Sequence, residues 1–256
     1  MKDVRRDLSK RDKLFLFLIL FLAYQAPEGI GMRLLQSMSV LSVLMLLFFP
    51  VAWLVGRAMG FRGYDAWFLD LRKSALVLLC VCFIAAISAK VAAIFLGMHL
   101  GIYQIASNQL SLTFVSLLSA MAMTFFPSVA EDIVTRGFVM RMFPANSRWL
   151  AIVLVSSVVY VLNHIYRLAN GPVEWLMLFC FGLAYASVMV ASKSLWPAVG
   201  LHWGWNFAGA MSDQVADITL LDRQSQSFLS AGVHLVLFAI CLVWIRQRNA
   251  RQSISN

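Results

Sequence analysis

Two adjacent acidic residues, Glu131 and Asp132, lie inside a long apolar stretch of this 256-residue chain. The segment 112–130 that precedes them carries no charged residue, and Arg136 follows Asp132 at a spacing of four. Acidic groups within a membrane-spanning helix are rare and costly, so they indicate a functional site with partners. The fold must therefore bring neutralising or hydrogen-bonding groups to these two carboxylates.

The composition is that of an integral membrane protein. Hydrophobic residues make up 61% of the chain and charged residues only 13%, whereas soluble domains have about 45–50% and about 25%. The unbroken apolar runs are unlike the short alternating strands of a membrane barrel. We therefore predict an all-α polytopic bundle. The four cysteines all lie in apolar runs and are interpreted as small core residues.

The apolar runs predict eight transmembrane helices, since each approaches the length needed to cross a bilayer. They are placed at residues 14–26, 34–55, 74–97, 110–140, 150–166, 174–191, 195–211 and 228–245. Pro27 and Gly29 are expected to end the first helix, and 98–109 is expected to form a loop. We predict a single membrane domain over residues 1–256. It divides into an N-terminal accessory region (residues 1–109), a catalytic core (residues 110–211) and a C-terminal region (residues 212–256).

The basic residues, which give a net charge of +9, predict the orientation of the chain. With eight helices, four of the 21 Lys and Arg residues fall on the side away from the termini, and the remaining 17 fall on the side of the termini. The positive-inside rule then places both termini in the cytoplasm. We expect a bacterial inner membrane protein with the lipid bilayer as a partner. No basic-aromatic patch or phosphate-binding loop indicates nucleic-acid binding.

The spacing of the charged residues after the apolar segment gives the two acids different expected partners. Asp132 and Arg136 are four residues apart with the acid first, which favours an ion pair on one helix face. Glu131 is rotated by roughly 140° from Arg136 at 3.6 residues per turn. We therefore expect Asp132 to neutralise Arg136 and Glu131 to face the interior of the bundle. A purely structural ion pair is the alternative.

Two further polar clusters lie in later helices. Tyr160 and His164 are four residues apart, as are His202 and Asn206, so each pair shares a helix face. Counted from the charged helix ends at about 1.5 Å per residue, Glu131, His164 and His202 lie roughly 15, 24 and 14 Å deep. A tilted helix would bring His164 level with the other two. We expect one pocket that opens toward the cytoplasm.

Such a pocket is suited to amide hydrolysis within the membrane. A carboxylate and an imidazole that share a water act as a general base when the water attacks a carbonyl group. A second imidazole and an amide N–H donate hydrogen bonds to the oxyanion that develops, which is worth about 3–4 kcal/mol per donor. The residues therefore indicate hydrolysis of an amide bond.

The three motifs, in this order on successive helices, resemble those of the CPBP family, the CAAX-prenyl-endopeptidase-like and bacteriocin-processing Abi proteins. The resemblance covers about residues 124–209. It implies that Glu131 and His164 activate the water and that His202 and Asn206 stabilise the oxyanion. It also implies catalysis without a metal, on a membrane-associated protein or peptide that is cleaved in a C-terminal or leader segment.

Two positions depart from the family pattern. Asp132 stands where the family usually has Glu, and Tyr160 stands where Phe is more common. Asp132 keeps the charge with a shorter reach, and the Tyr160 hydroxyl adds a group able to form a hydrogen bond in the site. With Arg136, these two are the predicted supporting residues.

The residues leave three other functions open. Zn²⁺ held by Glu131, His164 and His202 would give a metalloprotease, since this ligand set is chemically adequate. A non-enzymatic membrane scaffold or immunity protein of the same fold is a second alternative, although none of the motif residues is lost. A proton-coupled transporter is disfavoured because no paired half-repeats are visible. His99 and His234 match no motif and are interpreted as structural.

Overall fold

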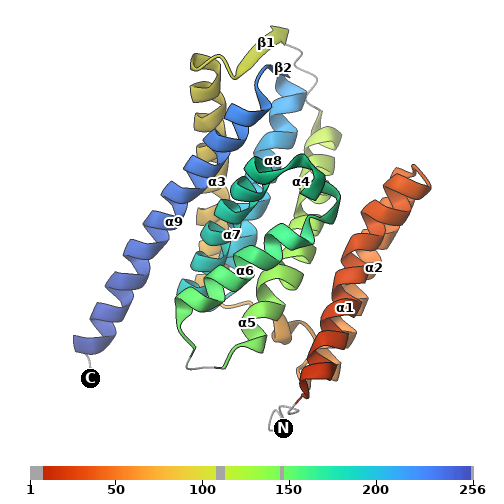
Figure 1. The fold of residues 1–256 in the computed structure, drawn as a ribbon, viewed down its shortest axis with the longest axis vertical. Helices are drawn as coiled ribbons and strands as arrows, with labels where there is room; N and C mark the ends of the chain where they lie inside the picture. The colour runs from red at the N-terminus through yellow and green to blue at the C-terminus, as the bar shows by residue number, and fades with distance from the viewer. Residues whose placement is uncertain (1–7, 108–112, 145–146, 255–256) are drawn as a thin grey trace.

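The computed structural model of the protein describes residues 8–107, 113–144 and 147–254. Helices run side by side through almost the whole molecule (Figure 1), which confirms the predicted all-α membrane bundle. The α-helices are α1 (Lys10–Ala26), α2 (Met38–Ala58), α3 (Lys73–His99), α4 (Phe114–Asp132), α5 (Phe138–Met142), α6 (Trp149–Asn163), α7 (Pro172–Ser192), α8 (Trp196–Val215) and α9 (Arg223–Ile254). The basic residues Lys2, Arg5 and Arg6 lie outside the described residues.

Shorter elements connect or extend these helices. The π-helical segments are η1 (Pro27–Leu34), which continues α1, and η3 (Ile133–Gly137), which joins α4 to α5. The 3₁₀ segments are η2 (Tyr64–Trp67) and η4 (Ile165–Asn170). Strands β1 (Tyr103–Ser107) and β2 (Asp217–Leu220) pair antiparallel at the end of the molecule opposite both termini (Figure 1).

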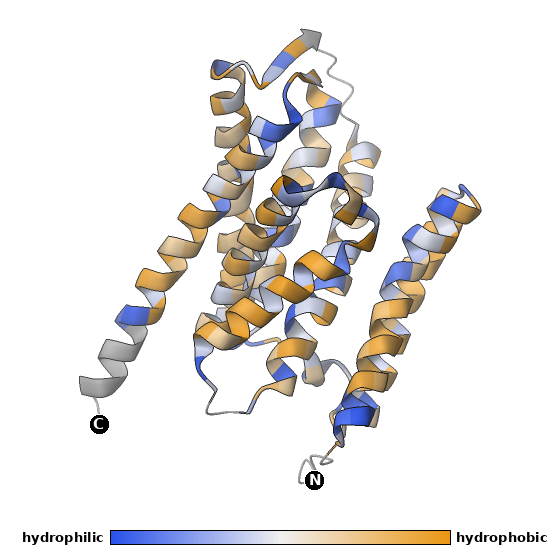
Figure 2. Ribbon diagram, viewed as in Figure 1, coloured by the Kyte–Doolittle hydropathy of each residue, from blue (hydrophilic) through white to orange (hydrophobic). Residues whose placement is uncertain are grey.

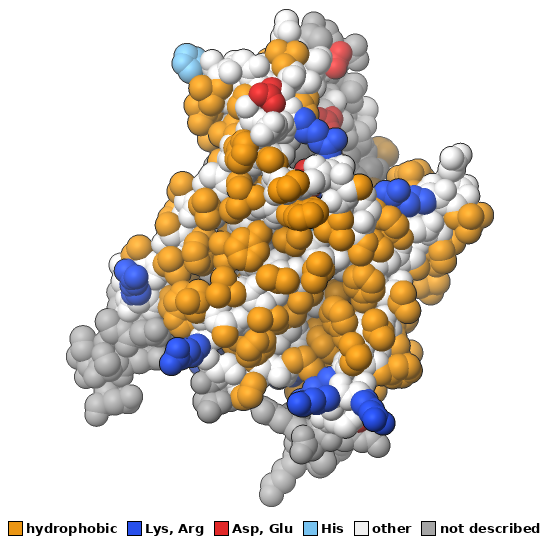
Figure 3. Space-filling view, viewed as in Figure 1, with side chains coloured by type: hydrophobic (Ala, Val, Ile, Leu, Met, Phe, Trp, Pro, Cys, Tyr) orange, Lys and Arg blue, Asp and Glu red, His pale blue; other side chains and the backbone are white. Residues whose placement is uncertain are grey.

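Six helical segments in the described residues are long and apolar enough to span a membrane: Lys10–Leu34, Met38–Ala58, Lys73–His99, Phe114–Met142, Pro172–Ser192 and Arg223–Gln247. α6 is apolar but shorter, and α8 is not among the six, so the count of eight crossings stays a prediction. Hydrophobic residues dominate the middle of α1 and α2 in Figure 2. Figure 3 shows hydrophobic side chains across the visible face, with Lys and Arg side chains toward its margins.

Several predicted boundaries differ from those of the structure. Pro27 and Gly29 do not end the first helix, because the chain continues through η1 with wider π-helical hydrogen bonds. A local change of helix type satisfies backbone groups that a proline frees within a bilayer. The expected loop 98–109 contains β1, and its partner β2 lies between α8 and α9. The fifth helix ends at Asn163 rather than at residue 166.

Glycines bring α8 directly onto α3. A Cβ atom at Gly200 would lie 2.5 Å from the backbone oxygen of Leu79, and one at Gly204 would lie 2.4 Å from that of Phe83. Both distances are too short for any side chain, so this small-xxx-small pair is what permits the close approach of the two backbones. His202 lies between the two glycines and is thereby carried on a firmly seated helix.

Candidate active site

The two acids are the last residues of α4, immediately before η3. All residues from Ser128 to Val139 are buried. In η3, the Thr135 hydroxyl donates a hydrogen bond of 2.8 Å to the backbone oxygen of Glu131. Single π-helical turns inside α-helices frequently mark functional sites. Here the turn places both carboxylates at an irregular point of the helix, deep in the bundle.

Asp132 is neutralised mainly within its own helix. Its Oδ1 atom accepts a hydrogen bond from Nη1 of Arg136, which confirms the predicted pair, and lies 3.0 Å from Nδ1 of His202. The guanidinium lies over the rings of Tyr160 and Tyr185, 4.5 and 4.9 Å from their centroids. Nε and Nη2 of Arg136 have no hydrogen-bond partner in the described residues. Cation–π contacts with the two rings therefore offset part of the free-energy cost of burying this guanidinium.

Glu131 is held by groups from other helices. Its Oε1 atom accepts a hydrogen bond of 3.1 Å from Nδ2 of Asn163 and lies 3.4 Å from Nδ1 of His164. Its Oε2 atom lies 3.5 Å from Nε2 of His202. Both histidine distances are long for a direct hydrogen bond. The expected encounter of Glu131 with His164 is therefore present, and a second imidazole lies on its other side.

The two imidazoles are oriented by different acceptors. Nδ1 of His164 lies 2.8 Å from the backbone oxygen of Tyr160. A carbonyl oxygen only accepts hydrogen bonds, so this Nδ1 carries the hydrogen, and Nε2 has a lone pair when the ring is neutral. By contrast, the two nitrogens of His202 face two carboxylates, those of Asp132 and Glu131. His164 is thus suited to accept a proton, and His202 is suited to donate hydrogen bonds.

Asn206 lies one turn away from the other three predicted catalytic residues. Its Nδ2 atom donates a hydrogen bond of 3.2 Å to the hydroxyl of Ser128, which precedes Glu131 by three residues. α4 and α8 run in opposite directions in Figure 1. Residues later in α8 therefore lie beside residues earlier in α4. The structure therefore brings Glu131, His164 and His202 together and leaves Asn206 beside them rather than among them.

Two site residues were not found from the sequence. Asn163, which holds Glu131, accepts hydrogen bonds from Nε2 of Gln25 at its backbone oxygen, 2.7 Å, and at Oδ1, 3.2 Å. Both side chains are buried. Because Oδ1 faces Gln25, Nδ2 of Asn163 is left to face Glu131. The available signal was a glutamine inside an apolar helix and an asparagine next to a motif histidine.

His234 has the structural role that the sequence indicated. It is fully buried on α9, where its Nδ1 donates to the backbone oxygen of Ser230 over 2.8 Å. Its Nε2 then accepts from the hydroxyl of Tyr185 over 3.0 Å. The ring of Tyr185 stacks on that of His202, with centroids 5.1 Å apart. His234 thus stabilises one wall of the site from a helix that carries none of the motifs.

Helix tilt brings His164 level with Glu131, as predicted. α6 runs obliquely across the bundle (Figure 1), so its length does not translate into depth. The predicted opening toward the side of the termini stays a prediction. On that side the neighbouring residues Thr135, Ser156 and Ala198 are all buried. Asn206, which lies on the opposite side of the site, is exposed.

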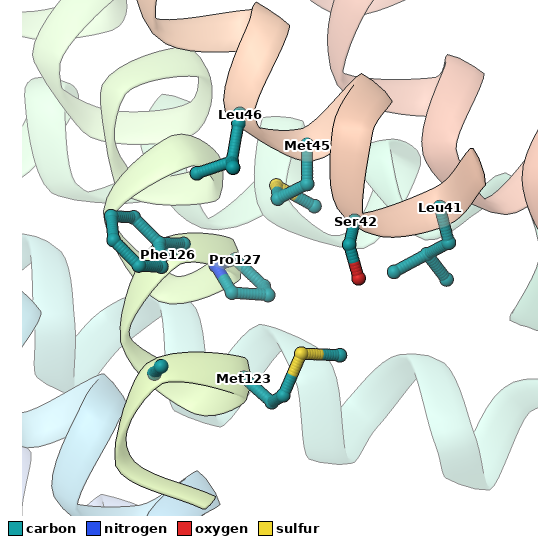
Figure 4. A pocket seen from close by; sticks show the side chains of 8 residues that line it. Leu41, Ser42, Met45, Leu46, Met123, Phe126 and Pro127 are labelled. Atoms are coloured by element: carbon teal, nitrogen blue, oxygen red, sulfur yellow. The ribbon is translucent and has the colours of Figure 1, made fainter. Parts of the chain in front are cut away.

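An apolar groove borders α4 from its middle toward Glu131. It has a volume of about 200 Å³ and lies between α2 and α4. Its lining residues are Leu41, Ser42, Met45, Leu46, Ala122, Met123, Phe126 and Pro127 (Figure 4). Pro127 is one helical turn before Glu131. Almost no polar surface lines the groove, so it is suited to apolar groups.

A metal ligand set is not assembled in the described residues, where no three His, Cys, Asp or Glu side chains converge with suitable geometry. Nδ1 of His164 already faces a carbonyl oxygen, and Nδ1 of His202 faces Asp132. A metal ion at Glu131 would therefore have to use the Nε2 atoms of both rings. The zinc alternative is left to experiment.

A family model described as type II CAAX prenyl endopeptidase Rce1-like matches residues 112–208. This segment contains α4 to α7 and most of α8, and with them every site residue predicted from the motifs. Comparison with curated proteins gave no significant match. The match leaves α1 to α3 and α9 outside, so Gln25 and His234 belong to regions of the chain that the family model does not cover.

Proposed function

We propose that this protein is an intramembrane endopeptidase, because residues 112–208 match a family model described as type II CAAX prenyl endopeptidase Rce1-like. Its substrate is a peptide bond in a membrane-associated protein or peptide, near a C-terminal or leader segment. We also propose that the protein lies in a bacterial inner membrane with both termini in the cytoplasm. The excess of basic residues on the side of the termini supports this orientation.

One observation carries the proposal. The carboxylate of Glu131 lies between two imidazoles, 3.4 Å from Nδ1 of His164 and 3.5 Å from Nε2 of His202. These separations are too long for strong direct hydrogen bonds but leave each group able to share a water molecule. A carboxylate positioned in this way within a buried site is the arrangement expected of a general base.

The proposed reaction needs no group from outside the chain except water. Glu131, assisted by His164, takes a proton as the water oxygen bonds to the peptide carbonyl carbon. The carbonyl oxygen becomes an oxyanion that accepts hydrogen bonds from His202 and Asn206. When the C–N bond breaks, the same proton passes to the leaving nitrogen. The products are a carboxylate and an amine.

Substitution of Glu131 tests the function. Glu131→Gln keeps the shape and the hydrogen bond from Asn163 but cannot accept the proton, so we expect cleavage to fall by at least about 10²–10⁴-fold. Comparative membrane proteomics of cells with either form should reveal an uncleaved precursor. Glu28→Gln, which removes an exposed acid paired with Arg33, is the matched control. Processing that survives Glu131→Gln would exclude the proposed base.

Removal of metal ions separates the two protease mechanisms. We expect the purified protein to keep its activity after treatment with a chelator. Loss of activity that Zn²⁺ restores would instead support a zinc site built on Glu131, His164 and His202. A scaffold or immunity protein would show neither effect, because its biological role would survive Glu131→Gln.

A further inference from the structure

The site is sealed in one direction along its helices. Moving from Glu131 toward the end of the molecule that carries the termini, the next turn of α4 presents Thr135, which is 0% exposed. From His202 the preceding turn of α8 presents Ala198, which is also 0% exposed. On α6, Ser156 is fully buried and donates a hydrogen bond of 2.8 Å to the backbone oxygen of Thr135. These contacts close the bundle below the site.

In the other direction, the residues around the site are more exposed. Asn206 lies four residues beyond His202 and therefore shares its helix face, the face that meets Glu131. Yet Asn206 is exposed, whereas the side chain of His202 is only 4% exposed. The side chain of His164, at the end of α6, is 13% exposed. Exposure thus rises over a single turn toward the end that carries β1 and β2.

The chemistry of Asn206 indicates that this opening holds water. A side-chain amide in hydrocarbon would lack partners for most of its hydrogen-bonding groups, which is costly. Asn206 donates a hydrogen bond to Ser128, and the residue is otherwise exposed. The surface beside Asn206 is therefore better suited to water than to lipid.

We propose that the substrate peptide reaches Glu131 from the membrane side that carries β1 and β2, opposite the side of both termini. This inference rests on the proposed protease function. Combined with cytoplasmic termini, it defines the substrate class as a segment of a membrane-associated protein exposed outside the cytoplasm. A leader or C-terminal segment of an exported protein has this location.

Thiol labelling tests the position of the opening without any need for activity. The four native cysteines are replaced by alanine, and single cysteines are introduced by mutation. Each variant is reconstituted in sealed vesicles, and the accessibility of an N-terminal tag shows its orientation. A charged maleimide that cannot cross the bilayer is added to one side at a time. We expect Asn206→Cys to react only from the side opposite the tag. The exposed positions Arg57→Cys and Arg223→Cys report the tag side and the opposite side.

The outcomes of the labelling are distinct. Reaction of Asn206→Cys from the tag side, or from neither side while both controls react, overturns the proposal. Size-exclusion profiles of the detergent-solubilised variants verify that each one is folded. Ser156→Cys, a buried position below the site, should stay unlabelled from both sides.

An activity measurement then connects the opening to the substrate. Ala210→Cys lies one further turn along the same face of α8, outside the catalytic set. A bulky impermeant maleimide added opposite the tag should reduce cleavage at least tenfold, and the same reagent on the tag side should leave it unchanged. Inhibition from the tag side would refute the proposed entrance. Absence of all peptide cleavage by the unmodified protein in detergent would instead refute the protease function, whatever the labelling shows.

Discussion

The end of α6 and the middle of α8 each supply one histidine to Glu131, but they do so in different ways. His164 is the C-terminal cap of its helix, partly exposed, and oriented by a carbonyl oxygen of its own helix. His202 is buried in mid-helix, between glycines packed on α3, and oriented by carboxylates from α4. The first arrangement leaves a nitrogen able to accept a proton, while the second fixes a hydrogen-bond donor. The two imidazoles are therefore not interchangeable.

Of the two histidines, His164 has the larger expected effect on the rate when it is replaced by alanine. Loss of a general acid–base group costs about 10²–10⁴-fold in rate, measured as the cleavage rate in detergent. Because the ring is partly exposed at the helix end, added imidazole should restore some of the activity. The thermal unfolding midpoint should change little. Failure of imidazole to rescue this variant while it remains folded would contradict the role of His164 as an accessible proton acceptor.

His202→Ala should affect both activity and stability. Loss of one oxyanion donor costs about 10²–10³-fold in rate. The buried Asp132 also loses one of its partners, which costs about 1–3 kcal/mol of unfolding free energy and should lower the thermal midpoint. Because the position is buried between packed helices, imidazole should not restore activity. Rescue equal to that of His164→Ala would show that the two environments are equivalent.

Gln25→Ala should have a smaller effect, on the His164 side alone. Without Gln25 the amide of Asn163 is able to rotate, so Glu131 loses a reliable donor and takes up a proton more readily. We expect about a tenfold lower cleavage rate and a shift of the acidic limb of the pH–rate profile toward higher pH. Gln104→Ala, at an exposed position of β1, is the control. An unchanged profile would mean that Gln25 only supports the packing of α1.

The smallest effect is expected for Tyr160→Phe. The structure uses the backbone oxygen of Tyr160 to orient His164 and its ring to cover Arg136, and both remain in this variant. Activity should stay within about twofold. Tyr160→Leu removes the cation–π contact, worth about 0.5–2 kcal/mol, and should lower the thermal midpoint. A large loss of activity in Tyr160→Phe would assign the hydroxyl a role in the site.

Much of the site could be predicted because its pairs are local in the sequence. Asp132 and Arg136 meet through helical spacing alone, and the same spacing places His202 and Asn206 on one face. The apolar runs likewise indicate most of the helices. The exact ends were less predictable, since Pro27 is accommodated by the wider turns of η1 and α6 stops one residue before His164. Such adjustments depend on neighbouring helices.

The sequence by itself determined the membrane class, the order of the motifs and the different roles of the two acids, because these depend on composition and on spacing within one helix. Only the tertiary structure decided that Asn163, oriented by Gln25, holds Glu131 and that Asn206 lies one turn aside. These features depend on how helices tilt, cross and pack. Contacts between residues as distant as 25 and 163 leave no periodic signal in the chain.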